Sequence, residues 1–444
     1  MLSDAITTVR SVLLVRNGVD HDARVLRAAR VAEQTLGAAS LVVGTATPSS
    51  PAGSALVEGV QVLRLPARPR PLRRTPGRGP GSGVDVPDAP RTNARLRARG
   101  RLRRILSGLS FTLQALSLAR RVRPELVHAN DWNTMWSGLA IKLCCRARLV
   151  YDSHELWPDR NGRWEWRPWL LASEALFVRA ADEVITASPG YADVLSKRYR
   201  VPRPTVVRNI PDGPLSGVCA TGQPSTDSLL TDAPRARTGQ QQTPLIVYIG
   251  GLMPGRGLEQ TIDALALAPT MRLRAVGPGS QEYRSSLLAR AVAAGVADRL
   301  ELREPVPPTA VAGALDGATA GLCLIQPVCR SYELTLPNKL FEYAAAGVPV
   351  LASDLPVIAT VVRAEQLGEV VAHDDPRGIA AGLQRLAEPA RWSEAARRSH
   401  TFARVNGWQG ESRVLARAYA RALARGASNR PAEQPRSEAG AQQA

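Results

Sequence analysis

A lysine and a glutamate stand about one helical turn apart in the segment LPNKLFEY, residues 336–343. The segment predicts the start of a short helix, and the spacing puts Lys339 and Glu342 on one face of it. Unpaired N–H groups and the helix dipole favour an anion such as phosphate at that end, where a lysine alone is disfavoured. A bound phosphate would remove this conflict, and the carboxylate of Glu342 could accept two hydrogen bonds from a ribose diol. The alternative is an ordinary surface ion pair.

A glycine-rich turn earlier in the chain, IGGLMPGRGLE at residues 249–259, suggests a similar arrangement. Its glycines, Gly250 and Gly251 among them, permit close approach of the backbone to a ligand. Arg256 precedes a predicted helix and could bind a diphosphate through two parallel hydrogen bonds. The G-x-G-x-x-G spacing of dinucleotide-binding folds is not met, which argues against NAD. The alternative is a glycine-rich turn with a solvated arginine.

Short apolar strands alternate with helical spacing along most of the chain, and polar residues follow the strands. Such alternation predicts parallel sheets covered by helices, with ligands beyond the carboxyl ends of the strands. The candidates placed there are Gly18, Asp20 and His21 after the first strand, Asp131, His154 and Glu155 after later ones, and Gly277 and Asn338 in the second half. A lone histidine is more often structural than catalytic. The D-x-D pattern at residues 20–22 is too short to predict a metal site.

The alternation breaks twice, and the breaks divide the chain. Residues 64–104 are rich in Arg, Pro and Gly, which predicts a mobile loop, and the helix at 105–121 is expected to pack in the core. A polar segment without periodicity predicts a linker between two α/β domains. The expected ranges are 1–205 for the N-terminal domain, 206–243 for the linker, 244–407 for the C-terminal domain, 408–424 for a helix packing back towards the N-terminal domain, and 425–444 for a disordered tail.

The chain of 444 residues is strongly basic, with a formal net charge of +18. That balance points to nucleic acid, an anionic membrane or phosphorylated ligands, unless it reflects an arginine-rich proteome. Five cysteines without a C-x-x-C pair predict neither a zinc site nor a disulfide framework. No apolar run approaches the roughly 18 residues of a membrane span, and no signal peptide is recognised, so we expect a cytoplasmic protein.

Seven segments together resemble the family 4 glycosyltransferases, in the same order as in that family. They are NGVDHDARVLRAA, ELVHAND, LVYDSHELWP, ADEVITAS, VYIGGLMPGRGLE, AVGPG and LPNKLFEYAAAGVPVLAS. The likeness covers most of residues 9–424. It implies the GT-B fold, in which two Rossmann-like domains face each other across a cleft. It also implies a retaining enzyme that uses a UDP- or GDP-linked sugar donor, without a further cofactor or a catalytic metal.

The resemblance assigns roles to individual residues. Glu342 matches the glutamate that holds the donor ribose, Arg256 the basic residue that neutralises the diphosphate, and His154 the histidine near the reacting face of the sugar. The last two are the expected catalytic residues. The donor site is expected to comprise Gly18, Gly250, Gly251, Arg256, Gly277, Asn338, Lys339 and Glu342. The acceptor site, in the N-terminal domain, is expected to comprise Asp20, His21, Asp131 and Glu155.

Two departures from the family pattern fall in the expected donor site. The paired glutamates of the family lie eight positions apart, but Leu334 stands eight positions before Glu342, and the nearby Glu333 is displaced by one. What contacts the donor sugar is therefore left open. A second basic residue of the family is replaced by Gly251, and Lys339 is a candidate for the missing charge.

The implied reaction is hexosyl or N-acetylhexosaminyl transfer to an acceptor hydroxyl, in the assembly of surface polysaccharides or glycoconjugates. The acceptor would be a glycan, lipid-linked or a small molecule. Because family acceptors are often lipid-linked, the arginine-rich segment suits a peripheral protein at the anionic inner face of the cell membrane.

Two other functions are compatible with parts of the sequence. A nucleotide-sugar 2-epimerase of the same fold would need several acidic and histidine residues around the sugar, and the chain offers few. A nucleic-acid-binding protein would need basic residues interleaved with aromatic ones. Aromatic residues are only 5% of the chain, and the tryptophans at 157–169 are their one cluster. Neither function is favoured over glycosyl transfer.

Overall fold

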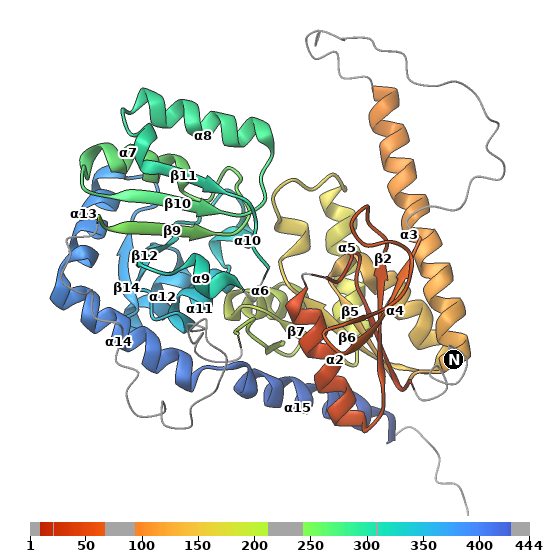
Figure 1. Cartoon of the computed structure of the whole chain (residues 1–444). Helices are drawn as coiled ribbons and strands as arrows, with labels where there is room; N and C mark the ends of the chain where they lie inside the picture. Colours follow the sequence, from red (N-terminus) through yellow and green to blue (C-terminus); the bar gives the residue numbers. More distant parts are fainter. Residues whose placement is uncertain (1–8, 21, 67–93, 212–242, 308–309, 428–444) are drawn as a thin grey trace, which may run out of the picture. The chain divides into compact units, whose positions relative to one another are not determined.

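The computed structural model describes most of the chain, and Figure 1 shows its course. The described residues are 9–20, 22–66, 94–211, 243–307 and 310–427. His21 and large parts of the expected loop, linker and tail lie outside the described residues. The chain divides into two compact units, one formed by 1–151, 180–183 and 417–444 and the other by 152–179 and 184–416. The domain ranges expected from the sequence stay a prediction.

An eight-stranded sheet has the strand order β3-β4-β2-β1-β5-β6-β7-β8. Its strands are β1 (Ser11–Leu14), β2 (Ser40–Thr45), β3 (Gly53–Val57), β4 (Val60–Leu65), β5 (Leu126–Asn130), β6 (Arg148–Ser153), β7 (Glu183–Thr186) and β8 (Thr205–Val206). β1 pairs in parallel with β2 and β5, whereas β3 runs antiparallel to β4 at the edge. β1 and β5 are buried along their whole length, as expected of parallel strands covered on both faces.

A six-stranded sheet has the order β11-β10-β9-β12-β13-β14, and its five neighbouring pairs are all parallel. Its strands are β9 (Leu245–Ile249), β10 (Arg272–Val276), β11 (Leu300–Arg303), β12 (Ala318–Cys323), β13 (Val350–Ser353) and β14 (Gly368–Val371). Alternate residues of β9 enter two different apolar clusters, Ile246 and Tyr248 in one, Val247 and Ile249 in the other. The first cluster includes side chains of three helices (α7, α8 and α13), and the second those of α11 and α12.

Most helices lie between strands in the chain, and the last three follow β14. The helices are α2 (Ala23–Leu36), α3 (Ala94–Val122), α4 (Trp132–Cys145), α5 (Arg167–Ala180), α6 (Pro189–Tyr199), α7 (Leu258–Leu267), α8 (Gln281–Ala293), α9 (Val311–Ala314), α10 (Arg330–Glu333), α11 (Asn338–Ala345), α12 (Pro356–Glu365), α13 (Pro376–Ala387), α14 (Pro389–Val405) and α15 (Trp408–Ala427). Two short 3-10 helices, Trp157–Asp159 and Ala297–Arg299, complete them. The prediction of two Rossmann-like α/β sheets is confirmed.

Helix α3 differs most from its prediction. It begins at Ala94, so residues 94–104, expected in a mobile loop, are helical. Its second half was expected in the core, but only one face of it is buried, through residues such as Phe111 and Ala115. The edge hairpin of β3 and β4 was not predicted either, because β3 is largely exposed and lacks a continuous apolar run.

Candidate active site

The side chain of Lys339 lies at the carboxyl edge of the six-stranded sheet. It projects from the first turn of α11, and its Nζ lies 3.8 Å from the ring centroid of Tyr248, a residue of β9. A Cβ placed on Gly250 would lie 3.4 Å from the same nitrogen. The ammonium therefore lies beside the Gly250–Gly251 turn, where the family pattern would place its second basic residue, which supports the idea that Lys339 supplies that charge.

Burial lowers the pKa of Lys339 to about 7, from an ordinary 10.5. The nearby positive charge of Arg256 lowers it further, while Cys323 and Glu342 act in the opposite direction. No carboxylate lies within ion-pair distance of Lys339 among the described residues, and the tyrosine face offers only a weak cation–π attraction. A lysine with such a lowered pKa is typical of a site that awaits an anion.

Arg256 is positioned by an aromatic residue. Its guanidinium carbon lies 4.3 Å from the ring centroid of Tyr332, and its Nη2 donates to the Tyr332 hydroxyl at 3.0 Å. Within the described part of the chain it has no carboxylate partner either. Two cations without counter-ions thus lie close enough for one to lower the pKa of the other. The cost of holding them together would be removed by a ligand with at least two negative charges.

Two helix N-termini at this site are uncapped by side chains. α7 follows Arg256 directly, begins after Gly257 at a φ of 76°, and has no side-chain cap. α11 begins after Pro337, also without one. By contrast, α8 is capped by Ser280, whose side chain accepts from the backbone of its first turn. The first-turn N–H groups of α7 and α11 are therefore available to an anionic ligand.

Glycine is required where the turns after β9 and β10 meet. Gly277 has a φ of 151°, and a Cβ on it would lie 1.9 Å from the carbonyl oxygen of Gly250. Gly250 itself has a φ of 132° and donates its N–H to the carbonyl of Val276 at 3.0 Å. These contacts let the two strand ends approach each other closely beside Lys339.

The remaining residues of the expected donor site have different surroundings. Glu342 is half-buried, and its charge acts on Lys339, whereas Asn338 is exposed at the first position of α11. Leu334 is buried, so its side chain offers nothing to a sugar. The displaced Glu333 forms an ion pair with Arg330 at 2.6 Å. The position of a second glutamate is thus not filled by a free carboxylate in this part of the structure.

The loop after β1 uses its carboxylates structurally. Asp20 forms an ion pair with Arg64 of β4 and accepts from Ser50, and Arg64 also donates to the Gly18 carbonyl at 2.8 Å. A Cβ on Gly18 would lie 2.8 Å from Oγ of Ser50, so this turn is tightly packed. Asp22 caps α2 by accepting from the N–H of Val25. Both acids of the D-x-D pattern are therefore engaged.

Strained backbone marks the carboxyl ends of two neighbouring strands in the first unit. Val19, after β1, has a φ of 72°, which is rare for a β-branched residue. Asp131, after β5, has a φ of 65° and a ψ of 165°. Because β1 and β5 pair in parallel, both outliers lie at the same edge of the sheet. Such strain is often retained at functional sites, which supports this edge as a ligand-binding one.

His154 and Glu155 follow β6. The Nε2 of His154 lies 3.0 Å from Oδ2 of Asp152, whose side chain is buried. This carboxylate therefore lies beside the imidazole ring. Glu155 lies 4.0 Å from Arg160, at the limit of an ion pair.

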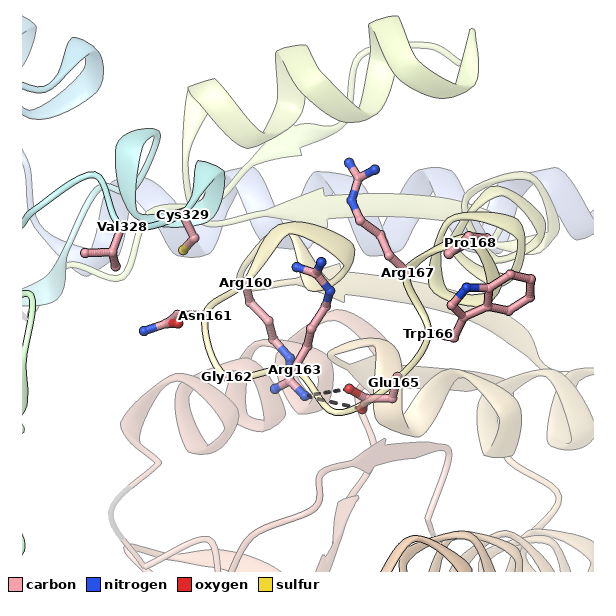
Figure 2. A pocket seen from close by; sticks show the side chains of 10 residues that line it. All are labelled: Arg160, Asn161, Gly162, Arg163, Glu165, Trp166, Arg167, Pro168, Val328 and Cys329. Carbon is pink, nitrogen blue, oxygen red and sulfur yellow. Dashed lines mark hydrogen bonds and ion pairs between the residues drawn. The ribbon is translucent and has the colours of Figure 1, made fainter. Parts of the chain in front are cut away.

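Sequence reasoning missed a pocket in the second unit that Figure 2 shows in detail. The pocket has a volume of about 590 Å³. Its lining residues are Arg160, Asn161, Gly162, Arg163, Glu165, Trp166, Arg167, Pro168, Val328 and Cys329. Eight of them come from the segment before and at the start of α5. The segment RNGRWEWRPW, with its interspersed arginines and tryptophans, is the sequence feature that could have indicated this pocket. From the sequence alone, its tryptophans were considered only as evidence for nucleic-acid binding.

Two kinds of feature are absent from the described residues. No group of three or more His, Cys, Asp or Glu side chains there could hold a metal ion. No described helix is both long and apolar enough to span a bilayer.

Comparison with known proteins identifies the family. The profile of Glycosyltransferase Family 4 matches residues 34–212, and that of Glycosyl transferases group 1 matches residues 243–389. The chain belongs to glycosyltransferase family 4. The resemblance drawn from the seven segments is thereby confirmed, and with it the assignment of the chain to the glycosyltransferases.

Individual relatives of this glycosyltransferase are distant. A glycogen synthase of Mycobacterium tuberculosis is 26% identical over 305 residues, which are 64% of this chain and 66% of that protein. The chain thus spans just under two thirds of that relative. The structure of sucrose-phosphate synthase from Thermosynechococcus elongatus matches with a TM-score of 0.71 and 18% identity, covering 94% of this chain and all of the other. Anabaena HepE in complex with UDP-glucose matches with a TM-score of 0.62 and 16% identity, covering 92% and 99%. These two matches bear on the fold alone.

Proposed function

We propose that this glycosyltransferase transfers a hexose or N-acetylhexosamine, with retention at the sugar carbon, from a UDP-linked donor to an acceptor hydroxyl. The observation that carries the proposal is the pair of cations, Lys339 and Arg256, beside two uncapped helix N-termini. A bound diphosphate would bring negative charge to both cations and to both helix N-termini. The UDP-glucose complex of HepE, a protein of the same fold, supports UDP over GDP.

The proposed chemistry follows from these charges. As the bond between the sugar and the diphosphate breaks, negative charge accumulates on the leaving phosphate, where Lys339, Arg256 and backbone N–H groups are already oriented. The leaving phosphate can itself take the proton of the acceptor hydroxyl, so that no dedicated general base is needed. His154, which lies beside Asp152, is proposed to contact the sugar near the reacting carbon. Transfer without a catalytic metal is part of the same proposal.

Titration of the full chain with UDP and 2′-deoxy-UDP tests the donor site. Wild type is expected to bind UDP more tightly, by about tenfold, because the carboxylate of Glu342 accepts from the ribose hydroxyls and a charge-assisted hydrogen bond contributes about 1.5–3 kcal/mol. Glu342→Gln should weaken UDP binding and reduce this discrimination. Glu333→Gln, at a carboxylate already paired with Arg330, is the matched control and should bind both ligands as wild type does. Equal affinities for both nucleotides in wild type would overturn the assignment of Glu342.

We also propose that α3 brings the enzyme to an anionic membrane surface, where a lipid-linked or glycan acceptor of surface polysaccharide assembly would be found. Five apolar side chains of α3, each 49–58% exposed, are Leu102, Ile105, Leu106, Leu109 and Leu113. At 3.6 residues per turn they fall within about 100° of the helix circumference. Arg101 and Arg103 are exposed on the two sides of this stripe. Figure 1 shows this end of α3 (orange) standing clear of its sheet.

Vesicle co-sedimentation tests this surface. The full chain is expected to bind vesicles of equal parts phosphatidylglycerol and phosphatidylcholine, and to bind pure phosphatidylcholine weakly, since apolar insertion and arginine attraction act together. The double change Ile105→Ser and Leu109→Ser should abolish binding without affecting UDP affinity. Leu143→Ser, at a leucine of α4 that is 78% exposed, is the control. Binding that survives the double change would assign the interaction to another part of the chain.

A further inference from the structure

The pocket of Figure 2 carries an excess of positive charge. Three arginines line it, Arg160, Arg163 and Arg167, against one carboxylate, that of Glu165. Arg160 is fixed by this glutamate at 3.3 Å, shown by the dashed lines, and by the face of Trp157 at 3.6 Å. Arg167 is fixed at 2.7 Å by Asp159, which lies outside the lining. Two of the three guanidinium groups are thus held in place before any ligand binds, and such preorganisation favours anion binding.

The Asp159 carboxylate supports this rigidity. Its burial alone would raise its pKa, but hydrogen bonds from Arg167 and Arg198 outweigh that effect and hold the pKa below its usual range. The carboxylate therefore stays ionised and keeps Arg167 in position at neutral pH. The segment is further anchored by the N–H of Leu156, which donates to Oγ of Ser331 at 3.3 Å.

Arg163 and Trp166 complete the pocket from its exposed side. Arg163 is exposed and forms no ion pair or hydrogen bond with any described residue. Trp166 is 74% exposed although it is the largest side chain of the lining. An exposed indole offers an apolar face with a polar edge, which suits stacking on the C–H face of a sugar ring. The pocket therefore combines groups for an anion with a surface for a sugar.

One wall of this pocket also belongs to the proposed donor site. Val328 lines the pocket, and a Cβ on Gly255 would lie 3.5 Å from its side chain. The N–H of Gln326 donates to the Gly255 carbonyl at 3.0 Å. Gly255 directly precedes Arg256. Val328 therefore lies between a ligand in this pocket and the turn of Gly255 and Arg256. Arg256 is the cation that would contact the donor diphosphate.

We infer that this pocket binds the acceptor, and that the acceptor is an anionic sugar or polyol, bearing a phosphate or a carboxylate. The inference rests on the proposed function. In the transfer, a hydroxyl oxygen of the acceptor forms the new bond to the sugar carbon as the bond from that carbon to the diphosphate breaks. The hydroxyl proton goes to the leaving diphosphate. The anionic group of the acceptor takes no part in bond changes and is held by the arginines.

Calorimetric titration of the full chain, with and without saturating UDP, tests the inference. The probes are glucose 6-phosphate, glucuronate and glucose, which present a phosphate, a carboxylate or neither. At least one charged probe is expected to bind about tenfold more tightly than glucose, the size of effect that one charge-assisted hydrogen bond gives. The stronger of the two charged probes tells which anionic group the acceptor carries. Equal binding of all three probes would overturn the inference.

Variants at exposed positions distinguish binding in this pocket from binding at the donor site. Arg163→Ala should bring the charged probes down to the affinity of glucose while leaving UDP affinity unchanged. Trp166→Ala should weaken all probes alike, and Arg272→Ala, at an exposed arginine of β10, should change none. If Arg163→Ala kept the preference for charged probes, the inference would fail. A chain that selects charged probes without binding UDP would refute the proposed donor site instead.

Discussion

Lys339→Met is expected to weaken UDP binding by roughly 10- to 100-fold and, at the same time, to stabilise the folded protein. The loss of affinity follows from removing one charged hydrogen-bond donor to the diphosphate, about 1.5–3 kcal/mol. The gain in stability follows from removing a charge that is held in a desolvated position without a carboxylate partner. A residue kept at a cost to stability is typical of a functional site.

The stability effect should depend on pH. The pKa of Lys339 is lowered to about 7 in the folded protein from an ordinary 10.5, so between these values the unfolded chain binds more protons. The free energy of unfolding of wild type therefore rises with pH across that window. Lys339→Met does not titrate, so its advantage should be largest below pH 7 and shrink as the pH rises towards 10.5.

Thermal unfolding of both proteins across this pH range, together with UDP titration, measures the two effects. Lys197→Met, at an exposed lysine of α6, is the matched control and should alter neither stability nor affinity. A variant at Lys339 that unfolds more easily and binds UDP normally would show that Lys339 does not contact the diphosphate.

Arg256→Ala is expected to lower the rate of the chemical step by about 10²- to 10³-fold, as for the loss of one preorganised group that stabilises charge in a transition state. Arg256→Lys should recover only part of the rate, because an ammonium can neither bind a diphosphate through two parallel bonds nor stack on Tyr332 as a guanidinium does. The measurement is UDP release from a saturating UDP-sugar, with or without acceptor.

Two further variants test whether a lower rate is caused by the loss of the positive charge of Arg256 at this turn. Tyr332→Phe keeps the ring under Arg256 and removes the hydroxyl that accepts at 3.0 Å, so a small loss is expected. Arg272→Ala controls for the removal of a surface charge. Wild-type turnover by Arg256→Ala would show that the positive charge at this turn does not act on the leaving group.

The central strands of the two sheets could be predicted, whereas the edge hairpin of β3 and β4 and the start of α3 could not. Strands such as β1 and β9 are largely apolar because both faces of a parallel sheet are buried, and that pattern is visible in sequence. The first turns of α3 contain many arginines, so neither periodicity nor composition marked them as helical. The apolar stripe on α3 is exposed because no other element packs against it among the described residues. Only the structure shows this.

The charges of the donor site could be predicted, but their surroundings could not. Lys339 and Arg256 were recognised by type and position near helix starts. The ring of Tyr248 under Lys339 and the ring of Tyr332 under Arg256 come from other elements, and only the folded sheet brings them together. The arginine pocket was missed for a similar reason, since its wall at Val328 is about 160 residues away in sequence from the rest of its lining.

Proton uptake on UDP binding tests the central claim most directly, namely that Lys339 is a diphosphate contact. At pH 8 the lysine is mostly uncharged in the free protein, since its pKa is lowered to about 7, while the phosphates of UDP are fully ionised. Binding should draw about one proton from the buffer, seen as different titration heats in phosphate and Tris, and Lys339→Met should take up none. Equal heats for wild type in both buffers would contradict the account.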